Sequence, residues 1–246
     1  MARFSRFVPQ FVRLRVRFIY QLIRGTLEKE MFLVENFVRE KTCFIDIGSN
    51  YGIYSYFMSK RFDQVKSFEP LLEASQELAS LKIPNVSIYN YALSARSGLF
   101  AIQIPIIEGL QVVQLSSLEN RDGETTKRLV SCRTLDSFNF TNVGLIKIDV
   151  EGHELSVLYG AIKTIRESSP VLLVEIEQRH TSNSIKDTFR FIEGLGYRGL
   201  FLWENQFHPI HKFDTQMHQG QSLDPQSRDY INNFLFVPEE SSNPCF

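Results

Sequence analysis

The turn that links an apolar run to the following helix is the most constraining feature of this sequence. Residues 44–47 are β-prone and lead into the turn Gly48-Ser49-Asn50-Tyr51-Gly52 and a helix-like segment at residues 53–60. Glycine has no Cβ, so such a turn lets a small cofactor approach bare backbone. A second apolar run ends at Glu69, where a carboxylate can hold both hydroxyls of a ribose. The pattern predicts a nucleoside-containing cofactor at the carboxyl edge of a parallel sheet.

The spacing within the turn separates two classes of cofactor. A dinucleotide-binding turn reads G-x-G-x-x-G, and its second glycine admits the pyrophosphate. Here the pattern is D-x-G-x-N-x-G, formed by Asp46, Gly48, Asn50 and Gly52. An anion at Asp46 repels pyrophosphate but suits the ammonium and sulfonium groups of S-adenosylmethionine. The alternatives are an NAD(P)-dependent oxidoreductase, a non-catalytic nucleotide-binding module, and a turn whose glycines serve packing alone.

A second segment, Lys147-Ile148-Asp149-Val150-Glu151-Gly152-His153-Glu154, narrows the choice. Together with the glycine turn, Glu69-Pro70, residues 92–94, residues 134–136 and residues 157–161, it resembles the FkbM family of S-adenosylmethionine-dependent methyltransferases. The matching pieces extend over residues 44–177. The resemblance implies O-methylation of a hydroxyl on a sugar or glycan, a glycolipid or a secondary metabolite.

The order of apolar runs and helix-like segments predicts an α/β fold. We expect a Rossmann-like class I methyltransferase fold, with a doubly wound, mostly parallel, seven-stranded sheet whose last strand is antiparallel. The expected strands are residues 43–47, 65–69, 86–91, 145–149, 171–177, 197–203 and 233–237. The expected helices are residues 51–60, 71–81, 153–166 and 185–193. A β insertion at residues 98–133 has β-prone runs at 99–104 and 112–115 and a polar loop at 119–127.

Length and composition indicate one large domain with additions. The chain has 246 residues, of which 43% are hydrophobic, and a net charge of −1. We expect an N-terminal extension at residues 1–35, a methyltransferase domain at 36–238 and a tail at 239–246. The near-neutral charge argues against nucleic-acid binding. The three cysteines lack C-x-x-C spacing, and no apolar run reaches the roughly 20 residues of a membrane span. We therefore expect a cytoplasmic protein.

The first 24 residues differ from the rest in charge. They contain six arginines and no acid, interleaved with aromatic residues. One interpretation is a helix that packs on the domain with its arginines in solvent. Another is an interfacial helix in peripheral contact with a membrane, and a third is an organelle transit peptide. The residues concerned are Arg3, Phe4, Arg6, Phe7, Phe11, Arg13, Arg15, Arg17, Phe18, Tyr20 and Arg24.

The candidate site residues follow the strand ends, where open α/β sheets bind ligands. Asp46, Gly48, Asn50 and Gly52 are expected to border the methionine part of the cofactor, and Glu69 the ribose. Asn90 and Ala92 are expected at the adenine edge, and Asp149 where the methyl group meets the acceptor. If the acceptor is a hydroxyl, the candidate bases are Asp149, His153 and His180.

Several of these residues also have plainer interpretations. Glu151 and Glu154 open a helix, where acids favour the positive end of the helix dipole. Lys147 lies in an otherwise apolar strand and can pair with Asp149 or Glu175 as scaffolding. A divalent ion held by Asp149, Glu175 and Glu177 is a less favoured alternative.

Overall fold

The structure is a computed structural model that describes residues 9–119, 123–181, 184–220, 222–225, 227 and 229–239. The expectations for Arg3, Phe4, Arg6 and Phe7, and for the tail beyond Glu239, lie outside the described residues.

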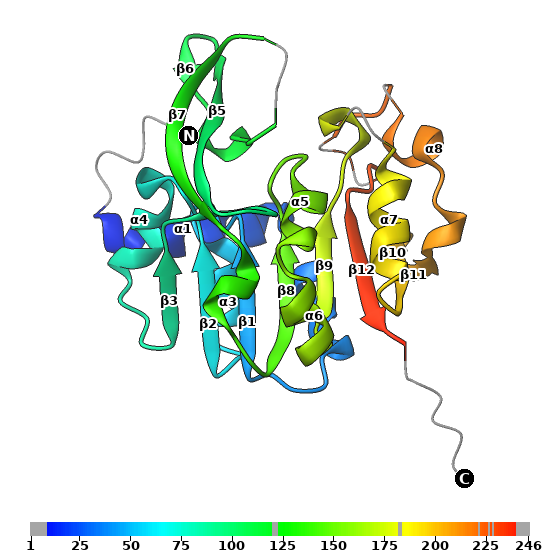
Figure 1. Cartoon of the computed structure of the whole chain (residues 1–246). Helices are drawn as coiled ribbons and strands as arrows, with labels where there is room; N and C mark the ends of the chain where they lie inside the picture. The colour runs from blue at the N-terminus through cyan, green and yellow to red at the C-terminus, as the bar shows by residue number, and fades with distance from the viewer. Residues whose placement is uncertain are drawn as a thin grey trace.

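One large sheet forms the centre of the protein (Figure 1), with strand order β11-β10-β12-β9-β8-β1-β2-β3. The pairs β3-β2, β2-β1, β1-β8 and β8-β9 are parallel, and β12 is antiparallel to both β9 and β10. The expected doubly wound sheet and its antiparallel last strand are confirmed. The strands are β1 (Cys43–Ile47), β2 (Gln64–Phe68), β3 (Val86–Tyr89), β8 (Val143–Ile148), β9 (Val171–Glu175), β10 (Tyr197–Trp203), β11 (Gln206–Pro209) and β12 (Asn233–Pro238).

The expected count of seven strands is wrong, because β11 adds an eighth to the described sheet. β10 and β11 are antiparallel and pair Trp203 with Gln206. The two residues between them, Glu204 and Asn205, both have positive φ angles, of 49° and 63°. A two-residue turn of this kind matches the twist of a hairpin. The sequence signal is weak here because neither turn residue is glycine.

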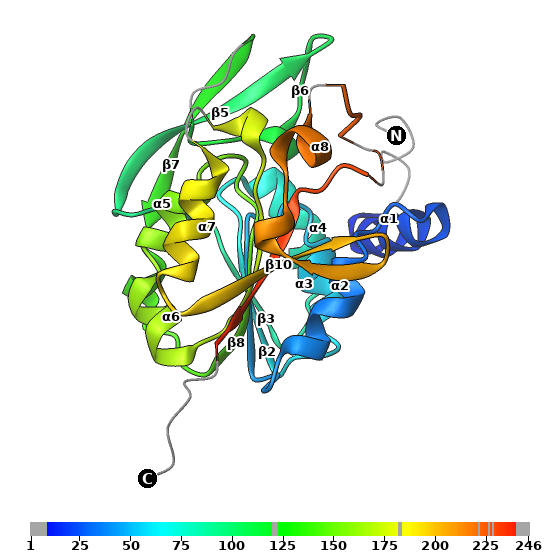
Figure 2. The same ribbon diagram turned by 90° about the vertical axis from the view of Figure 1, so that its right-hand side faces the viewer.

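Helices cover both faces of the sheet (Figure 2). Alternate residues of β1 point to opposite sides: Ile45 and Ile47 belong to one core cluster with Val157 and Ile165, whereas Phe44 packs with helix residues of the other face. α5 (Glu154–Tyr159), α6 (Ile162–Ser168) and α7 (Ile185–Glu193) lie on the first face. α1 (Gln10–Arg24), α2 (Glu30–Leu33), α3 (Ile53–Met58) and α4 (Leu72–Ser80) lie on the second, and α8 (Thr215–Gln219) lies near β10.

The helix expected at residues 153–166 is two helices, α5 and α6. The interruption is fixed by Asp136, whose backbone N–H donates to the carbonyl of Gly160 at 3.0 Å. Its carboxylate in turn accepts the backbone N–H groups of Lys163 and Thr164, at 3.0 and 2.8 Å. A carboxylate that satisfies the free N–H groups of a first turn starts a new helix.

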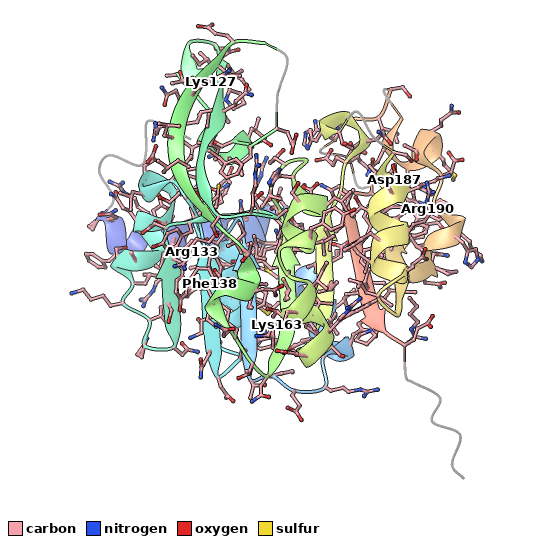
Figure 3. All side chains as sticks on the ribbon, in the orientation of Figure 1. Lys127, Arg133, Phe138, Lys163, Asp187 and Arg190 are labelled. Carbon is pink, nitrogen blue, oxygen red and sulfur yellow. The ribbon has the colours of Figure 1, made fainter. Side chains whose placement is uncertain are left out.

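The expected β insertion is a long hairpin that rises above the carboxyl edge of the sheet (Figure 1). β5 (Gly98–Ile107) pairs with β7 (Thr125–Arg133), and β4 (Ala92–Leu93) and β6 (Leu110–Gln111) complete a second sheet. Figure 3 places Lys127 toward the hairpin tip, and Arg133 and Phe138 at its base. There the guanidinium of Arg133 lies 5.0 Å from the ring centroid of Phe138.

Two details of the insertion differ from expectation. The run at residues 112–115 contains a short 3₁₀ helix (Val113–Leu115), and β7 begins at Thr125, inside the expected polar loop. After the 3₁₀ helix the chain turns back toward β5, because Ser117 exchanges two backbone hydrogen bonds with Gln103. In addition, the Ser117 hydroxyl donates to the carbonyl of Glu151 at 2.7 Å. Residues 113–118 are thereby folded over the sheet edge.

The described part of the N-terminal segment packs on the domain. Leu14 of α1 is fully buried, and Met31 of α2 belongs to the same core cluster as Phe44. Arg17 forms an ion pair with Glu77 of α4 at 3.1 Å. The expected domain boundary at residues 35 and 36 stays a prediction. Among the described residues, no helix has the length and apolarity required to cross a bilayer.

We predict that Gly52→Ala destabilises the protein more than Gly109→Ala. Both glycines have positive φ, 85° and 73°, which costs a non-glycine residue about 1–2 kcal/mol. A Cβ on Gly52 would lie 2.7 Å from the Cβ of Leu78, whereas one on Gly109 meets no atom within 4 Å. The overpacking should add about 1–3 kcal/mol at Gly52. Urea unfolding measures both losses, and equal losses would contradict a packing role for Gly52.

Candidate functional site

A cavity of about 240 Å³ lies at the carboxyl edge of the sheet. Its floor is formed by the segments that follow β1, β2 and β8, and its roof by residues 113–118 of the insertion. This is the edge at which the glycine turn and Glu69 predict a cofactor. The predicted site residues that line it are Gly48, Asn50, Glu69, Ala92, Asp149, His153 and Glu175.

The glycine turn is held between two neighbouring strands. The backbone N–H groups of Gly48 and Ser49 both donate to the carbonyl of Phe68 at 3.0 Å, and Asp149 donates its N–H to Ile47 at 3.0 Å. Gly48 has φ +78°, and a Cβ there would lie 1.8 Å from the carbonyl oxygen of Asp149. Glycine is therefore required at this position for the turn and the loop after β8 to meet.

The Glu69 carboxylate forms one wall of the cavity. It accepts the backbone N–H of Asn50 at 3.0 Å and that of Leu71 at 2.9 Å, one on each oxygen. Burial raises the pKa of Glu69 to about 7, although the two backbone hydrogen bonds oppose the shift. A carboxylate held rigidly in this way is suited to accept hydrogen bonds from a diol.

Asp46 lies under the turn rather than in the first cavity. It is 1% exposed, and its Oδ2 accepts the hydroxyl of Ser55 at 2.6 Å. Its Oδ1 is buried without a hydrogen-bond partner among the described residues. Burial raises the pKa of Asp46 to about 6. Asp46 lines a second cavity, of about 260 Å³, which shares Gly48, Asn50 and Asp149 with the first.

Of the two partners that the sequence offered for Lys147, Asp149 forms the ion pair, with 2.7 Å between Nζ and Oδ2. Burial alone would lower the pKa of the Lys147 ammonium, but Asp149, Glu28 and Glu175 nearby raise it. Glu175 sits beside this pair at the end of β9 and accepts a hydrogen bond from Asn232 at 2.7 Å. Burial and the negative charge of Asp149 hold the pKa of Glu175 well above its usual value. Asp149 lines both cavities and connects them.

The two candidate histidines have different surroundings. His153 lines the first cavity, but its Nδ1 lies 2.6 Å from Glu119 and its Nε2 lies 2.9 Å from the hydroxyl of Ser94. His180 lines a separate cavity between α5 and α7, and its Nδ1 lies 3.1 Å from Glu151. The structure therefore brings His153, and not His180, to the edge shared with Glu69 and Asp149.

Two predicted cofactor residues do not line either of the first two cavities. Gly52 faces Leu78 instead. The side chain of Asn90 donates to the carbonyl of Glu69 and to the hydroxyl of Ser75, both at 3.0 Å. Asn90 therefore braces the segment that carries Glu69.

The three carboxylates of the alternative metal site have different partners: Lys147 for Asp149, Asn232 for Glu175 and Arg179 for Glu177. Among the described residues, no group of three or more His, Cys, Asp and Glu side chains could hold a metal ion. Glu177 is 2.6 Å from Arg179 and accepts the hydroxyl of Tyr230 at 2.6 Å, away from Asp149. Asp149, Glu175 and Glu177 therefore do not form a ligand set in the described chain.

Some residues that line the two cavities come from segments in which the sequence predicted no site residue. Gln114 and Ser117 come from the insertion, and Arg17 and Glu28 from the N-terminal segment. Three polar residues close after an apolar run, Gln114, Ser116 and Ser117, are the signal that could have indicated the first two. Nothing in the local pattern distinguishes Arg17 from its neighbouring arginines.

Comparisons with known proteins agree with this geometry. A model of the methyltransferase FkbM domain matches residues 46–198. The hexuronic acid methyltransferase AglP of Haloferax volcanii is 27% identical over 202 residues, which cover 78% of this chain and 79% of AglP. The crystal structure of methyltransferase FkbM from Methylobacillus flagellatus KT aligns with a TM-score of 0.51 and 17% identity.

This structural alignment covers 80% of this chain but only 44% of the solved chain, so this chain spans less than half of that protein. At 17% identity, the likeness shows the fold alone. The family match covers more than half of the chain and includes the glycine turn, Glu69 and the Asp149 segment. It favours a methyltransferase over an NAD(P)-dependent oxidoreductase. This chain belongs to the methyltransferase FkbM domain family.

Proposed function

We propose that this chain transfers the methyl group of S-adenosylmethionine to a hydroxyl of a sugar-type acceptor. The observation that carries the proposal is the meeting of Gly48 and Asn50 of the glycine turn with Glu69 and Asp149 at one cavity in a chain of this family. The sugar is supported by AglP, which is named for hexuronic acid. Glycolipids and secondary metabolites with a free hydroxyl are the other acceptors that the resemblance implies.

The residues present fit this cofactor. Glu69 offers a rigid carboxylate for the ribose, and Ala92 leaves room for the adenine edge. The unpartnered Oδ1 of Asp46 offers an acceptor for an ammonium group. When bound, S-adenosylmethionine supplies an electrophilic methyl group.

In this proposal the protein contributes mainly position, because an in-line displacement depends on alignment of the reacting atoms. Asp149 connects the two cavities, and Lys147 fixes its carboxylate. We assign to Asp149 the contact with the acceptor hydroxyl. Asp149 also takes up the proton that the hydroxyl loses, and Glu175 lies beside it in the lining of the same cavity. His153 has both ring nitrogens engaged, so we assign it to holding the insertion, through Glu119, against the Ser94 turn.

We predict that the protein binds S-adenosylmethionine and S-adenosylhomocysteine but not NAD(P). Glu69→Ala should weaken binding by about 1.5–3 kcal/mol, the scale of hydrogen bonds to a charged group. Affinity should also fall as the pH is lowered through about 7, because burial places the pKa of Glu69 there and a protonated carboxyl is a poorer acceptor. Calorimetry across pH measures both effects.

Glu73→Gln is the matched control for this prediction, because Glu73 is an exposed α4 carboxylate paired with Arg128 outside both cavities. It should leave affinity unchanged. Heat of binding from NAD(P) and none from S-adenosylmethionine would overturn the proposed function.

We predict that Asp149→Asn lowers the rate of methyl transfer by about 10² or more, while cofactor affinity stays within about threefold. The variant keeps the shape of the side chain but removes its charge. Transfer of labelled methyl to glycans that contain hexuronic acid measures the rate. Glu177→Gln is the control, because Glu177 lies at the same sheet edge but lines none of the three cavities. Equal losses of affinity and rate in Asp149→Asn would make Asp149 a cofactor-binding residue instead.

We also propose peripheral membrane contact through the N-terminal segment. The outward face of α1 exposes apolar side chains beside arginines, and the chain has no acidic residue before Glu28. Cationic and apolar groups on one helix face suit an anionic bilayer. The cytoplasmic location stays a prediction. The exposed apolar residues of α1 are Phe11, Val16, Ile19, Tyr20, Leu22 and Ile23.

We predict that the protein sediments with anionic liposomes and is released at high salt, because each arginine near the surface contributes roughly 1 kcal/mol. Replacing Phe11, Ile19 and Ile23 with serine should abolish sedimentation without loss of cofactor binding. The same change at Leu99 and Leu129, which are 71% and 72% exposed on the insertion, is the control and should have no effect. If the α1 variant still sedimented with the liposomes, α1 would not be the segment that contacts the membrane.

A further inference from the structure

The second cavity lies beside the first and has walls from two parts of the chain. One wall is the turn after β1, with Gly48 and Asn50, and the other is the N-terminal segment, with Arg17. The family match begins at residue 46, so the N-terminal wall lies outside it. The cavity joins the first one at Gly48 and Asp149. A ligand that fills the first cavity can therefore extend into the second.

The lining of the second cavity holds charges of both signs: Asp46, Lys147 and Asp149 come from the sheet edge, and Arg17 and Glu28 come from the N-terminal segment. Asp46 lines the cavity with a buried Oδ1 that has no partner among the described residues, and the buried Oδ1 of Asn50 is unpartnered in the same way. Buried polar atoms in native proteins nearly always have a hydrogen-bond partner, so an unpartnered pair at a cavity indicates a ligand that donates hydrogen bonds. Arg17 supplies a cation from the opposite wall.

Arg17 is held in place while one edge of its guanidinium stays available. Its Nε and Nη2 donate to the carboxylate of Glu77 at 3.1 to 3.3 Å, and its Cζ lies 3.9 Å from the ring centroid of Tyr51. Within the described residues, Nη1 makes no hydrogen bond. A guanidinium fixed by a carboxylate and an aromatic ring loses little freedom when it binds a second carboxylate.

We propose that Arg17 of α1 binds the carboxylate of the amino-acid end of S-adenosylmethionine in the second cavity, opposite the turn residues that are expected to border the methionine part. This inference rests on the proposed function. It assigns to the N-terminal helix α1 a direct part in the cofactor site, through a residue that the family match does not include. A zwitterion needs one partner of each charge, and this cavity has both.

The test compares ligands with and without the amino-acid end. Titration calorimetry is done on the full chain with S-adenosylhomocysteine and with 5′-methylthioadenosine, which lacks the amino acid. Arg17→Gln should weaken S-adenosylhomocysteine by about tenfold or more, because a charge-assisted hydrogen bond is lost, but change methylthioadenosine by less than about twofold. Arg24→Gln is the control, because Arg24 lies on the same helix and does not line the cavity.

A second variant separates ligand binding from the anchoring of α1. Glu77→Gln removes the anchor of Arg17 on α4 but leaves the guanidinium, and Glu77 does not line the cavity. It should weaken S-adenosylhomocysteine binding by less than Arg17→Gln does, because the guanidinium remains although it is less firmly fixed. Equal weakening of both ligands by Arg17→Gln, or a loss in Glu77→Gln as large as in Arg17→Gln, would overturn the inference. If the wild type binds neither ligand, the proposed function itself fails.

Discussion

The contact between the glycine turn and the loop after β8 is the constraint on which the rest of the site depends. Gly48 and Asp149 are about a hundred residues apart, yet a single Cβ on Gly48 would overlap the carbonyl of Asp149. The contact exists because β1 and β8 are parallel neighbours, with Ile47 opposite Ile148. Parallel pairing brings the carboxyl ends of both strands to one edge, and every side chain assigned to the cofactor or the acceptor is placed relative to that edge.

Buried charged side chains are concentrated at the same carboxyl edge of the sheet. Asp46, Lys147 and Glu175 point to the same side of three adjacent strands, and the ammonium of Lys147 is surrounded by carboxylates. Replacing such a group with apolar residues is often neutral or stabilising, so stability alone does not explain its presence. The position of the group beneath the two joined cavities gives it a functional explanation. Lys147 holds Asp149 in one orientation, while burial raises the pKa of Asp46 to about 6.

The helix α1 has two faces with different roles in our proposals. The inward face carries Leu14 into the interior and Arg17 to Glu77, Tyr51 and the second cavity. The outward face is apolar and basic. A bilayer that binds the outward face would therefore lie next to the helix that closes the cofactor site, which suits an acceptor carried on a lipid.

The sequence alone determined the alternating α/β fold and the family, and it limited the partner of Lys147 to Asp149 or Glu175. Each of these is encoded locally, by residues at strand spacing or just beyond a strand end. Only the tertiary structure decided that β11 adds an eighth strand, that Gly52 and Asn90 line neither of the first two cavities, and that His180 lines a separate one. It also decided that Gln114 and Arg17 reach the cavities. These positions depend on how segments distant in the sequence pack against one another, and no local pattern specifies that packing.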